Sequence, residues 1–419
     1  MRHRLTFGKR IFLTSIAAFL LGIGNSSASL ARPQKAAKWV SSWASAEIGV
    51  DPKETLPSGK DMTLRQLIRL SVGGGPIRLR ISNAFGNSPL EIAGVHVARA
   101  VSPASSRIEQ STDRVVTFNG AQAVSIPAGA EYLSDPISLD VAPFATLAVS
   151  IHFAGLPQRQ TGHPGSRATS YFASGDQLSA DSLRDSNKVD RWYYLDGVDV
   201  QREKQSAAVA VIGDSIVDGH GVVSNTNRRW TDYLAERLKG RPLAMLNLGI
   251  GSNCLAQNCV GPNVPSRFGR DVLSRSGVKY VIILEGVNDL GMLTRDAPAA
   301  PEAHRSLVER MIGALAQVTR RAHERGIKVI GATIMPYGAS GYYHPDAASD
   351  ADREAVNAWI RAPGNVDAVV DFETLMRDPA RPERLKKQFD SGDGLHPSPE
   401  GYRFMGNIIP LSIFQGGDR

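Results

Sequence analysis

The sequence contains little cysteine: Cys254 and Cys259 are the only two among 419 residues, and they lie in one short loop. Two thiols without a nearby histidine do not supply the four ligands of a structural zinc site. A local disulfide fits an exported protein, but sequence spacing does not fix the geometry of the pair. A disulfide and two buried thiols therefore both remain open.

Long apolar runs are also absent. The apolar stretch 11–24 is shorter than the roughly 20 residues that a membrane span needs, and no later stretch is longer. The basic segment 2–10 precedes it, and small residues at 26–28 or 29–31 follow. This order is typical of a secretory signal. We expect residues 1–31 to be a signal peptide, and the mature protein to be secreted or periplasmic, without stable membrane insertion.

The formal charge of +7 overstates the charge of the mature chain, because four of the positive charges lie in the expected signal peptide. Its removal leaves +3, which does not indicate a nucleic-acid partner. A chain of 419 residues suits two domains.

The first half of the chain has the pattern of an antiparallel β domain, which we place at residues 38–200. Segment 76–82 alternates apolar and polar residues, as a half-buried strand does, and short strand signals recur between turns. This predicts a β-sandwich or jelly roll. Segment 63–70 fits either a strand or a helical turn. The aromatic run 191–195 fits either a packed strand or a sugar-stacking surface.

After a polar linker at 201–205, the pattern changes to alternating strands and helices over residues 205–419. The expected strands are 207–212, 243–248, 278–284, 327–334 and 366–372, and the clearest helices are 231–239, 303–325, 350–361 and one opened by Ser398-Pro399. Such alternation predicts a doubly wound parallel sheet with helices on both faces.

Polar clusters follow several of these strands, so they should meet at one edge of the sheet. Ser215 follows the first strand, the turn 249–252 follows the second, and Asn288 follows the third. Asp393 and His396 precede the last helix. A serine, a histidine and an acid are the parts of nucleophilic acyl transfer, in which the histidine takes the hydroxyl proton and the acid holds the imidazole.

Attack on an ester produces an oxyanion, which needs fixed N–H donors. The turn at Gly251 and Ser252 offers backbone N–H groups, and Asn288 offers a side-chain amide. Each feature also has a structural interpretation: Asn288 as a helix cap, Gly251 as part of a tight loop, the Asp–His pair as a surface turn. Their coincidence at one edge favours the catalytic interpretation.

Together, Gly213-Asp214-Ser215, the glycine turn after Asn247, Gly286-Val287-Asn288-Asp289 and Asp393-Gly394-Leu395-His396 resemble the SGNH hydrolases, or GDSL esterases. The resemblance implies a flavodoxin-like three-layer α/β/α domain that cleaves carboxylic esters without a metal or cofactor. It assigns Ser215 as nucleophile, His396 as base, Asp393 as its partner, and Asn288 with the backbone of Gly251 or Ser252 as oxyanion donors.

The N-terminal half is similar to a β-rich domain found in one secreted branch of that family, on segments 39–43 and 81–86. One departure concerns the second block, where Ser252-Asn253 replaces the usual Gly-Asn. A backbone donor survives that change if the turn does not need a positive φ. We expect Asp390 to be a loop residue. Asp218, His220 and His344 either border the pocket or lie at the surface, and surface placement is favoured for each.

The sequence thus predicts a secreted serine esterase, with acetyl or other short acyl groups on carbohydrates or small molecules as the expected substrates. A lipase, thioesterase or arylesterase with the same triad is one alternative. A catalytically inactive carbohydrate-binding protein is the alternative from another class.

Overall fold

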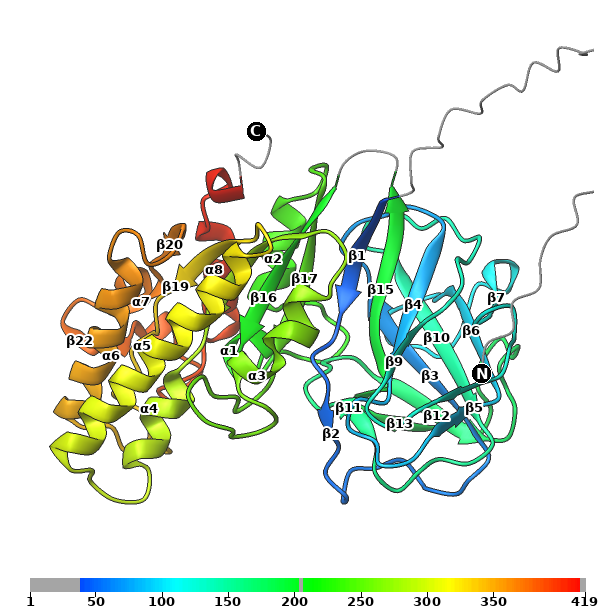
Figure 1. Cartoon of the computed structure of the whole chain (residues 1–419), viewed down its shortest axis with the longest axis horizontal. Coiled ribbons are helices and arrows are strands. Elements are labelled where there is room, and N and C mark those ends of the chain that lie inside the picture. Colours follow the sequence, from blue (N-terminus) through cyan, green and yellow to red (C-terminus); the bar gives the residue numbers. More distant parts are fainter. Residues whose placement is uncertain (1–37, 203–205, 415–419) are drawn as a thin grey trace, which may run out of the picture. The chain divides into compact units, whose positions relative to one another are not determined.

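The structure is a computed structural model that describes residues 38–202 and 206–414 (Figure 1). The expected signal peptide, 1–31, and linker residues 203–205 lie outside the described residues. The described residues all belong to one compact unit. The boundary that the sequence predicts between two domains stays a prediction.

The N-terminal part consists of antiparallel sheets, as the turn-punctuated sequence predicts. Its largest sheet has the order β13-β12-β3-β10-β6-β7, and a second has the order β1-β15-β4-β9. The strands are β1 (Lys38–Ala44), β2 (Ile48–Gly49), β3 (Met62–Arg69), β4 (Ile77–Ser82), β5 (Leu90–Ile92), β6 (Gly94–Arg99), β7 (Arg114–Val116), β8 (Val124–Ile126), β9 (Glu131–Leu133), β10 (Thr146–Phe153), β11 (Thr161–His163), β12 (Ser170–Ser174), β13 (Asn187–Val189), β14 (Trp192–Tyr193) and β15 (Leu195–Arg202).

Side-chain alternation builds the core of this β-rich region. In β4, Ile77, Leu79 and Ile81 are fully buried, while the arginines between them are half-buried. Segment 63–70, for which the sequence left a strand and a helical turn as alternatives, lies mostly in strand β3, which pairs with β10. The aromatic run forms β14 and, after a bend at Tyr194, the start of β15, and Trp192, Tyr193 and Tyr194 are buried. Because these rings are packed inside, they do not form a sugar-stacking surface.

The C-terminal part contains a five-stranded parallel sheet of order β17-β16-β18-β19-β20. Numbered from the first of these strands along the chain, the order is 2-1-3-4-5, that of flavodoxin-like folds. Strands β16 and β18 are almost continuously apolar because helices cover both faces of the sheet. The strands are β16 (Ala207–Gly213), β17 (Leu243–Gly249), β18 (Val278–Leu284), β19 (Lys328–Ala332) and β20 (Ala368–Val370).

The helices form the two outer layers. Helix α2 packs against α8, and α5 packs against α3, α4 and α6. The predicted fold class, a three-layer α/β/α domain preceded by a β-rich region, is confirmed (Figure 1). The helices are α1 (Ser215–Asp218), α2 (Trp230–Arg237), α3 (Val264–Phe268), α4 (Val287–Thr294), α5 (Pro301–His323), α6 (Ala347–Arg361), α7 (Phe372–Met376) and α8 (Pro399–Ile408), and a small hairpin joins β21 (Arg377–Asp378) to β22 (Arg381–Leu385).

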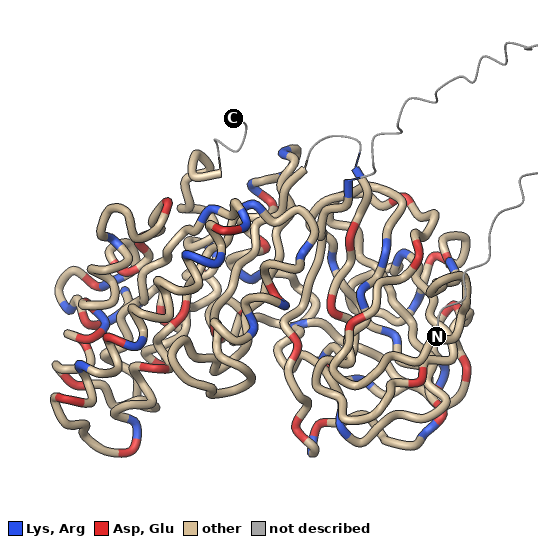
Figure 2. Tube along the Cα trace, in the orientation of Figure 1, with Lys and Arg blue, Asp and Glu red and all other residues tan. Residues whose placement is uncertain are grey.

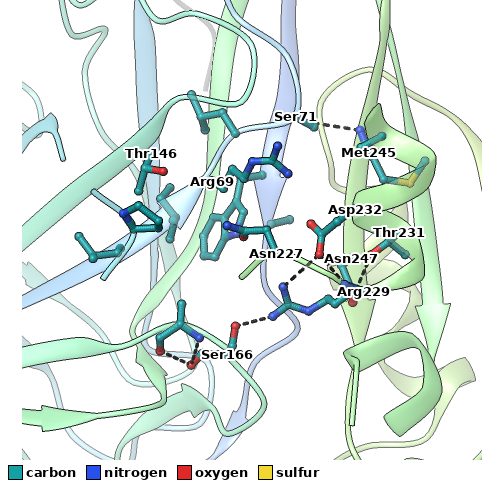
Figure 3. Close-up of a pocket in the computed structure, with 18 of the residues that line it drawn as sticks. Arg69, Ser71, Thr146, Ser166, Asn227, Arg229, Thr231, Asp232, Met245 and Asn247 are labelled. Carbon is teal, nitrogen blue, oxygen red and sulfur yellow. Dashed lines mark hydrogen bonds and ion pairs between the residues drawn. The ribbon is translucent and has the colours of Figure 1, made fainter. Parts of the chain in front are cut away.

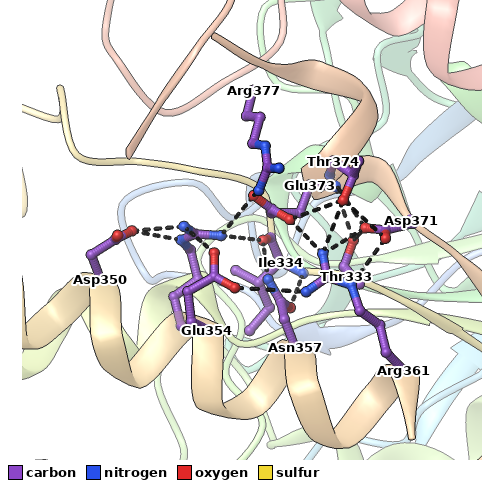
Figure 4. Close-up of polar contacts among 11 residues, drawn as sticks. Thr333, Ile334, Asp350, Glu354, Asn357, Arg361, Asp371, Glu373, Thr374 and Arg377 are labelled. Carbon is purple, nitrogen blue, oxygen red and sulfur yellow. Dashed lines mark hydrogen bonds and ion pairs between the residues drawn. The ribbon is translucent and has the colours of Figure 1, made fainter. Parts of the chain in front are cut away.

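A polar network fixes α6 beside the end of β19 (Figure 4). The Asn357 amide accepts from the N–H of Ile334 and donates to the carbonyl of the same residue, at 2.7 and 2.9 Å. The buried Glu373 carboxylate contacts Arg353 and Arg361. These contacts fix the chain just after β19, at the start of the loop 333–346.

Charges of both signs are interspersed along the described trace (Figure 2). Among the described residues, no helix is long and apolar enough to cross a membrane. The expectation that nucleic acid is not a partner stays a prediction.

Candidate active site

Ser215 begins α1 directly after β16, at the carboxyl edge of the sheet. The Asp214 carboxylate caps this helix by accepting the Ile216 N–H at 2.8 Å. Gly213 is required by close packing, because a Cβ there would lie 2.1 Å from the carbonyl oxygen of Leu284 on β18. The turn from strand to helix therefore places the Ser215 hydroxyl at the edge where the predicted polar clusters meet.

The structure brings Ser215, His396 and Asp393 into one hydrogen-bonded chain. Ser215 Oγ lies 2.9 Å from His396 Nε2, and His396 Nδ1 lies 2.6 Å from Asp393 Oδ2. Because a carboxylate only accepts, Nδ1 carries the proton and Nε2 is left to accept from the serine hydroxyl. This is the tautomer that general-base activation of a serine needs.

The loop before α8 orients Asp393. Its second oxygen, Oδ1, accepts the backbone N–H groups of Leu395 and His396 at 2.9 and 2.8 Å, and the Ser391 hydroxyl at 3.0 Å. Burial raises the pKa of Asp393, but the hydrogen bonds from His396 and from these backbone groups outweigh it and lower the pKa to about 2. Asp390 is a loop residue as expected, accepting the N–H groups of Gly392 and Gly394.

His220, which the sequence places either at the border of the pocket or at the surface, contacts the proposed base. It is exposed, as expected, but its ring stacks on that of His396 with centroids 4.0 Å apart. Burial, followed by the nearby His396 and Arg167, lowers the pKa of His220, so its neutral form is favoured. In the sequence, His220 is marked only by its position five residues after Ser215. It lies in the turn that follows the short helix α1.

The turn after β17 lies beside the nucleophile, since the Ile250 N–H donates to the carbonyl of Gly213 at 3.0 Å. Asn253 N–H closes the turn on the Ile250 carbonyl at 3.1 Å, which leaves the N–H groups of Gly251 and Ser252 at its tip. Ser252 has a φ of +57°. The turn therefore does need positive φ at the position where the family has glycine, and Ser252 adopts it at a backbone cost of about 1–2 kcal/mol.

A disulfide joins Cys254 to Cys259, which settles the question that the sequence left open. It closes the loop that follows the turn. The Asn253 amide donates to the carbonyls of Val260 and Pro262, both at 2.9 Å, and its oxygen accepts from the buried Arg267. The turn thus has a rigid base.

Asn288 occupies the second position of α4 and is buried. It is not the helix cap, because the N-cap position is Gly286 and no side-chain cap bond forms. Its Nδ2 donates instead to the carbonyl of Asn253 at 2.7 Å, and its Oδ1 accepts from the Tyr343 hydroxyl at 2.5 Å. An amide nitrogen has two hydrogens, so one remains beside the turn.

Three buried acids lie behind these residues. Burial raises the pKa of Asp214 to about 7 and that of Asp289 to about 6. Burial, then the neighbouring Asp214 and Asp289, raises the pKa of Glu285 well above its usual value. Arg267 ties this layer to the edge, donating to the carbonyls of Leu248 and Gly213.

The β-rich region also contacts the nucleophile helix. Asp218, for which surface placement was favoured over the border of the pocket, is buried instead, with its Oδ1 3.0 Å from His163 Nε2 of β11. The correction has a physical reason: helix α1 is one turn long and lies under the β-rich region. His344 is exposed as expected, with Nδ1 3.0 Å from the carbonyl of Arg295.

Two of the hollows among the described residues lie at this junction, and neither of these is lined by Ser215 or His396. The one in Figure 3, of about 60 Å³, lies between residues such as Arg69, Ser166 and Arg229. The other, of about 360 Å³, is bounded by β2, β11 and the disulfide loop.

Among the described residues, only one group of three has donor atoms close enough together for a metal ion, namely His220, Asp393 and His396. The two rings are stacked within 23° of parallel, so their lone pairs run side by side rather than toward one point. The arrangement does not fit a tetrahedral ion. The expectation of no metal and no cofactor stays a prediction.

The fold and this edge of the sheet define a carboxylic ester hydrolase. Residues 211–404 match the model of the GDSL-like lipase/acylhydrolase family. The resemblance seen in the sequence is thereby confirmed. No curated protein matches the chain.

Solved structures are similar at low identity. A GDSL-like lipase from Bacteroides thetaiotaomicron is 22% identical with a TM-score of 0.38, covering 50% of this chain and 88% of its own. A carbohydrate esterase family 2 enzyme with a carbohydrate-binding domain from Corynascus thermopiles is 13% identical with a TM-score of 0.39, covering 90% and 98%. A carbohydrate acetylesterase from Sinorhizobium meliloti is 16% identical with a TM-score of 0.35, covering 48% and 95%.

Proposed function

We propose that the protein is a secreted serine esterase that removes short acyl groups, acetyl above all, from carbohydrates or small molecules. The observation that carries the proposal is the chain of hydrogen bonds from Ser215 through His396 to Asp393, at 2.9 and 2.6 Å. The disulfide in the described structure supports export, because such bonds persist in oxidising compartments.

In the proposed reaction, Ser215 Oγ attacks the ester carbonyl carbon while His396 Nε2 takes the hydroxyl proton. The resulting oxyanion accepts hydrogen bonds from the Asn288 amide and from the backbone at Gly251 or Ser252. Collapse breaks the bond to the alcohol oxygen, which leaves with the proton from His396. Water then attacks the acyl-serine by the same route and releases the acid.

Acyl length is the part of the proposal that an assay decides first. The mature chain is assayed against p-nitrophenyl esters of increasing acyl length and against acetylated polysaccharide. The proposal predicts the highest kcat/KM for acetyl or another short acyl group, and loss of activity in Ser215→Ala. A preference for long acyl chains indicates a lipase instead. Equal activity of Ser215→Ala and wild type overturns the mechanism.

Export is tested separately by N-terminal sequencing of protein from an exporting host. We expect the mature chain to begin at Ser29 or Arg32. An intact Met1 contradicts the proposed localisation.

A further inference from the structure

Tyr343 is a buried tyrosine on the loop between β19 and α6, and it contacts the proposed oxyanion donor directly. Its hydroxyl donates to Asn288 Oδ1 at 2.5 Å. The ring is 3% exposed, and burial raises the pKa of the hydroxyl, which therefore keeps its proton. The group remains a donor wherever the protein is assayed.

Helix α4 is shaped to receive this ring. Gly291 lies one turn after Asn288, and a Cβ at Gly291 would lie 2.3–2.5 Å from three ring carbons of Tyr343. Such separations are far inside van der Waals contact. The absence of a side chain at Gly291 is what lets the tyrosine lie flat on the helix and reach back to Asn288.

The backbone of Tyr343 is held on the same helix. Thr294 Oγ1, at the last position of α4, donates to the carbonyl of Tyr343 at 3.2 Å. Tyr343 therefore spans α4 from its second residue to its last. This arrangement fixes the ring relative to Asn288.

The two partners of Asn288 leave its amide one favourable orientation. The Asn253 carbonyl accepts and must face Nδ2, while the Tyr343 hydroxyl donates and must face Oδ1. A hydrogen bond to Oδ1 also draws charge from the amide and strengthens Nδ2 as a donor. The second Nδ2 hydrogen is thus oriented before substrate arrives.

We propose that Tyr343 is a positioning residue, which fixes and polarises the Asn288 amide for the oxyanion formed at Ser215. The inference rests on the proposed function and extends it by one residue. Because the oxyanion exists mainly in the transition state, the contribution of Tyr343 falls on kcat rather than KM.

Tyr343→Phe keeps the ring and removes the hydroxyl. One neutral hydrogen bond corresponds to a roughly three- to tenfold change, so kcat for a short acyl ester should fall by that factor with KM nearly constant. Affinity for an alkylboronic acid, which forms a tetrahedral adduct with a serine oxygen, should fall by the same factor. Tyr342→Phe is the matched control, since Tyr342 is 60% exposed and its hydroxyl accepts from Arg295 at 3.5 Å; it should leave kcat unchanged.

A second variant tests the same geometry without removing the hydroxyl. Gly291→Ala must displace the ring, so it should also lower kcat. In an exposed helix position the same change stabilises by about 1 kcal/mol, and Gly313 in α5, with nothing within 4 Å of its missing Cβ, provides that control. Gly313→Ala should raise the melting temperature and leave kcat unchanged.

A double-mutant cycle with Asn288→Ala decides whether Tyr343 acts through Asn288. In that background Tyr343→Phe should have no further effect on kcat. A normal kcat for Tyr343→Phe, or the same loss with and without Asn288, overturns the inference, and a lowered melting temperature with normal kcat assigns the hydroxyl to stability alone. Ser215→Ala is measured alongside: if it retains activity, the proposed function itself fails, and the inference with it.

Discussion

At the scale of single residues, the site depends on hydrogen bonds whose directions are fixed by their partners. Asp393 sets the tautomer of His396, and Asn253 and Tyr343 set the amide of Asn288. The sequence was sufficient to predict Ser215, His396, Asp393 and Asn288 as candidates, because each follows a strand or precedes a helix. It could not predict the hydrogen bond of Tyr343 to Asn288 or the stacking of His220 on His396, because these contacts come from packing between distant segments.

Asn288→Ala tests whether this side chain is an oxyanion donor. Removal of one oxyanion donor in another serine hydrolase costs about 2.7–4 kcal/mol in the transition state, on the order of a hundredfold to a thousandfold in kcat. We expect a loss of that size here with a small change in KM. Steady-state kinetics with a short acyl ester provide the measurement. A near-normal kcat would leave the backbone turn as the only donor we can name.

At the scale of elements, the turn after β17 departs most clearly from its expected form. The sequence indicated that a glycine-to-serine change is harmless where φ is negative, but Ser252 has a φ of +57°. Helices and strands were predicted from the spacing of apolar residues. The segment that forms β3 was left open because its apolar residues fit both the helical and the strand spacing. The sign of φ in a turn is decided by local geometry, here by the hydrogen bond from the Asn253 N–H to the Ile250 carbonyl. The spacing of apolar residues carries no information about it.

Ser252→Gly tests this element. Relief of the left-handed strain offsets the extra entropy of glycine in the unfolded chain, so the free energy of unfolding should change by no more than about 1 kcal/mol, in the stabilising direction. Because the proposed donor is a backbone N–H, kcat should stay within about twofold. A tenfold loss of kcat in a fully folded variant would mean that the Ser252 side chain itself takes part.

At the scale of the whole molecule, buried polar contacts join the β-rich region to the hydrolase region. Arg275 and Asp196 form a bidentate pair at 2.6 and 2.7 Å, and both side chains are completely buried. His163 and Asp218 form a second buried contact, on the nucleophile helix itself. The sequence located both regions but not these pairs, since each partner lies more than fifty residues from the other.

Asp196→Ala tests the larger contact. Removing one member of a buried pair leaves the Arg275 charge unpaired, so the free energy of unfolding should fall by about 3–5 kcal/mol. Glu236→Ala is the control, because its pair with Arg69 also joins the two regions but Glu236 is 43% exposed; its loss should be below about 1 kcal/mol. Denaturant unfolding measures both. Equal losses would show that burial of the pair is not what holds the regions together.

The raised pKa of Glu285 predicts that the stability of the fold depends on pH. Its pKa is raised when folded, so the folded protein holds a proton that the unfolded chain releases above about pH 4.5. The contribution of Glu285 to stability is therefore complete below that pH and is lost as pH rises, by up to about 1.4 kcal/mol per pH unit. Glu285→Gln should flatten this decline above about pH 4.5. An unchanged slope would mean that Glu285 is not the buried acid responsible.

The central claim is that Ser215 is a nucleophile activated by His396, and covalent labelling tests it most directly. The mature chain is treated with a fluorophosphonate probe and its mass is measured before and after proteolysis. We expect one adduct per chain, on the peptide that contains Ser215, no adduct in Ser215→Ala, and labelling slowed at least a hundredfold in His396→Ala. Folded wild-type protein that takes up no probe, or a Ser215→Ala variant labelled as fast as wild type, would contradict the account.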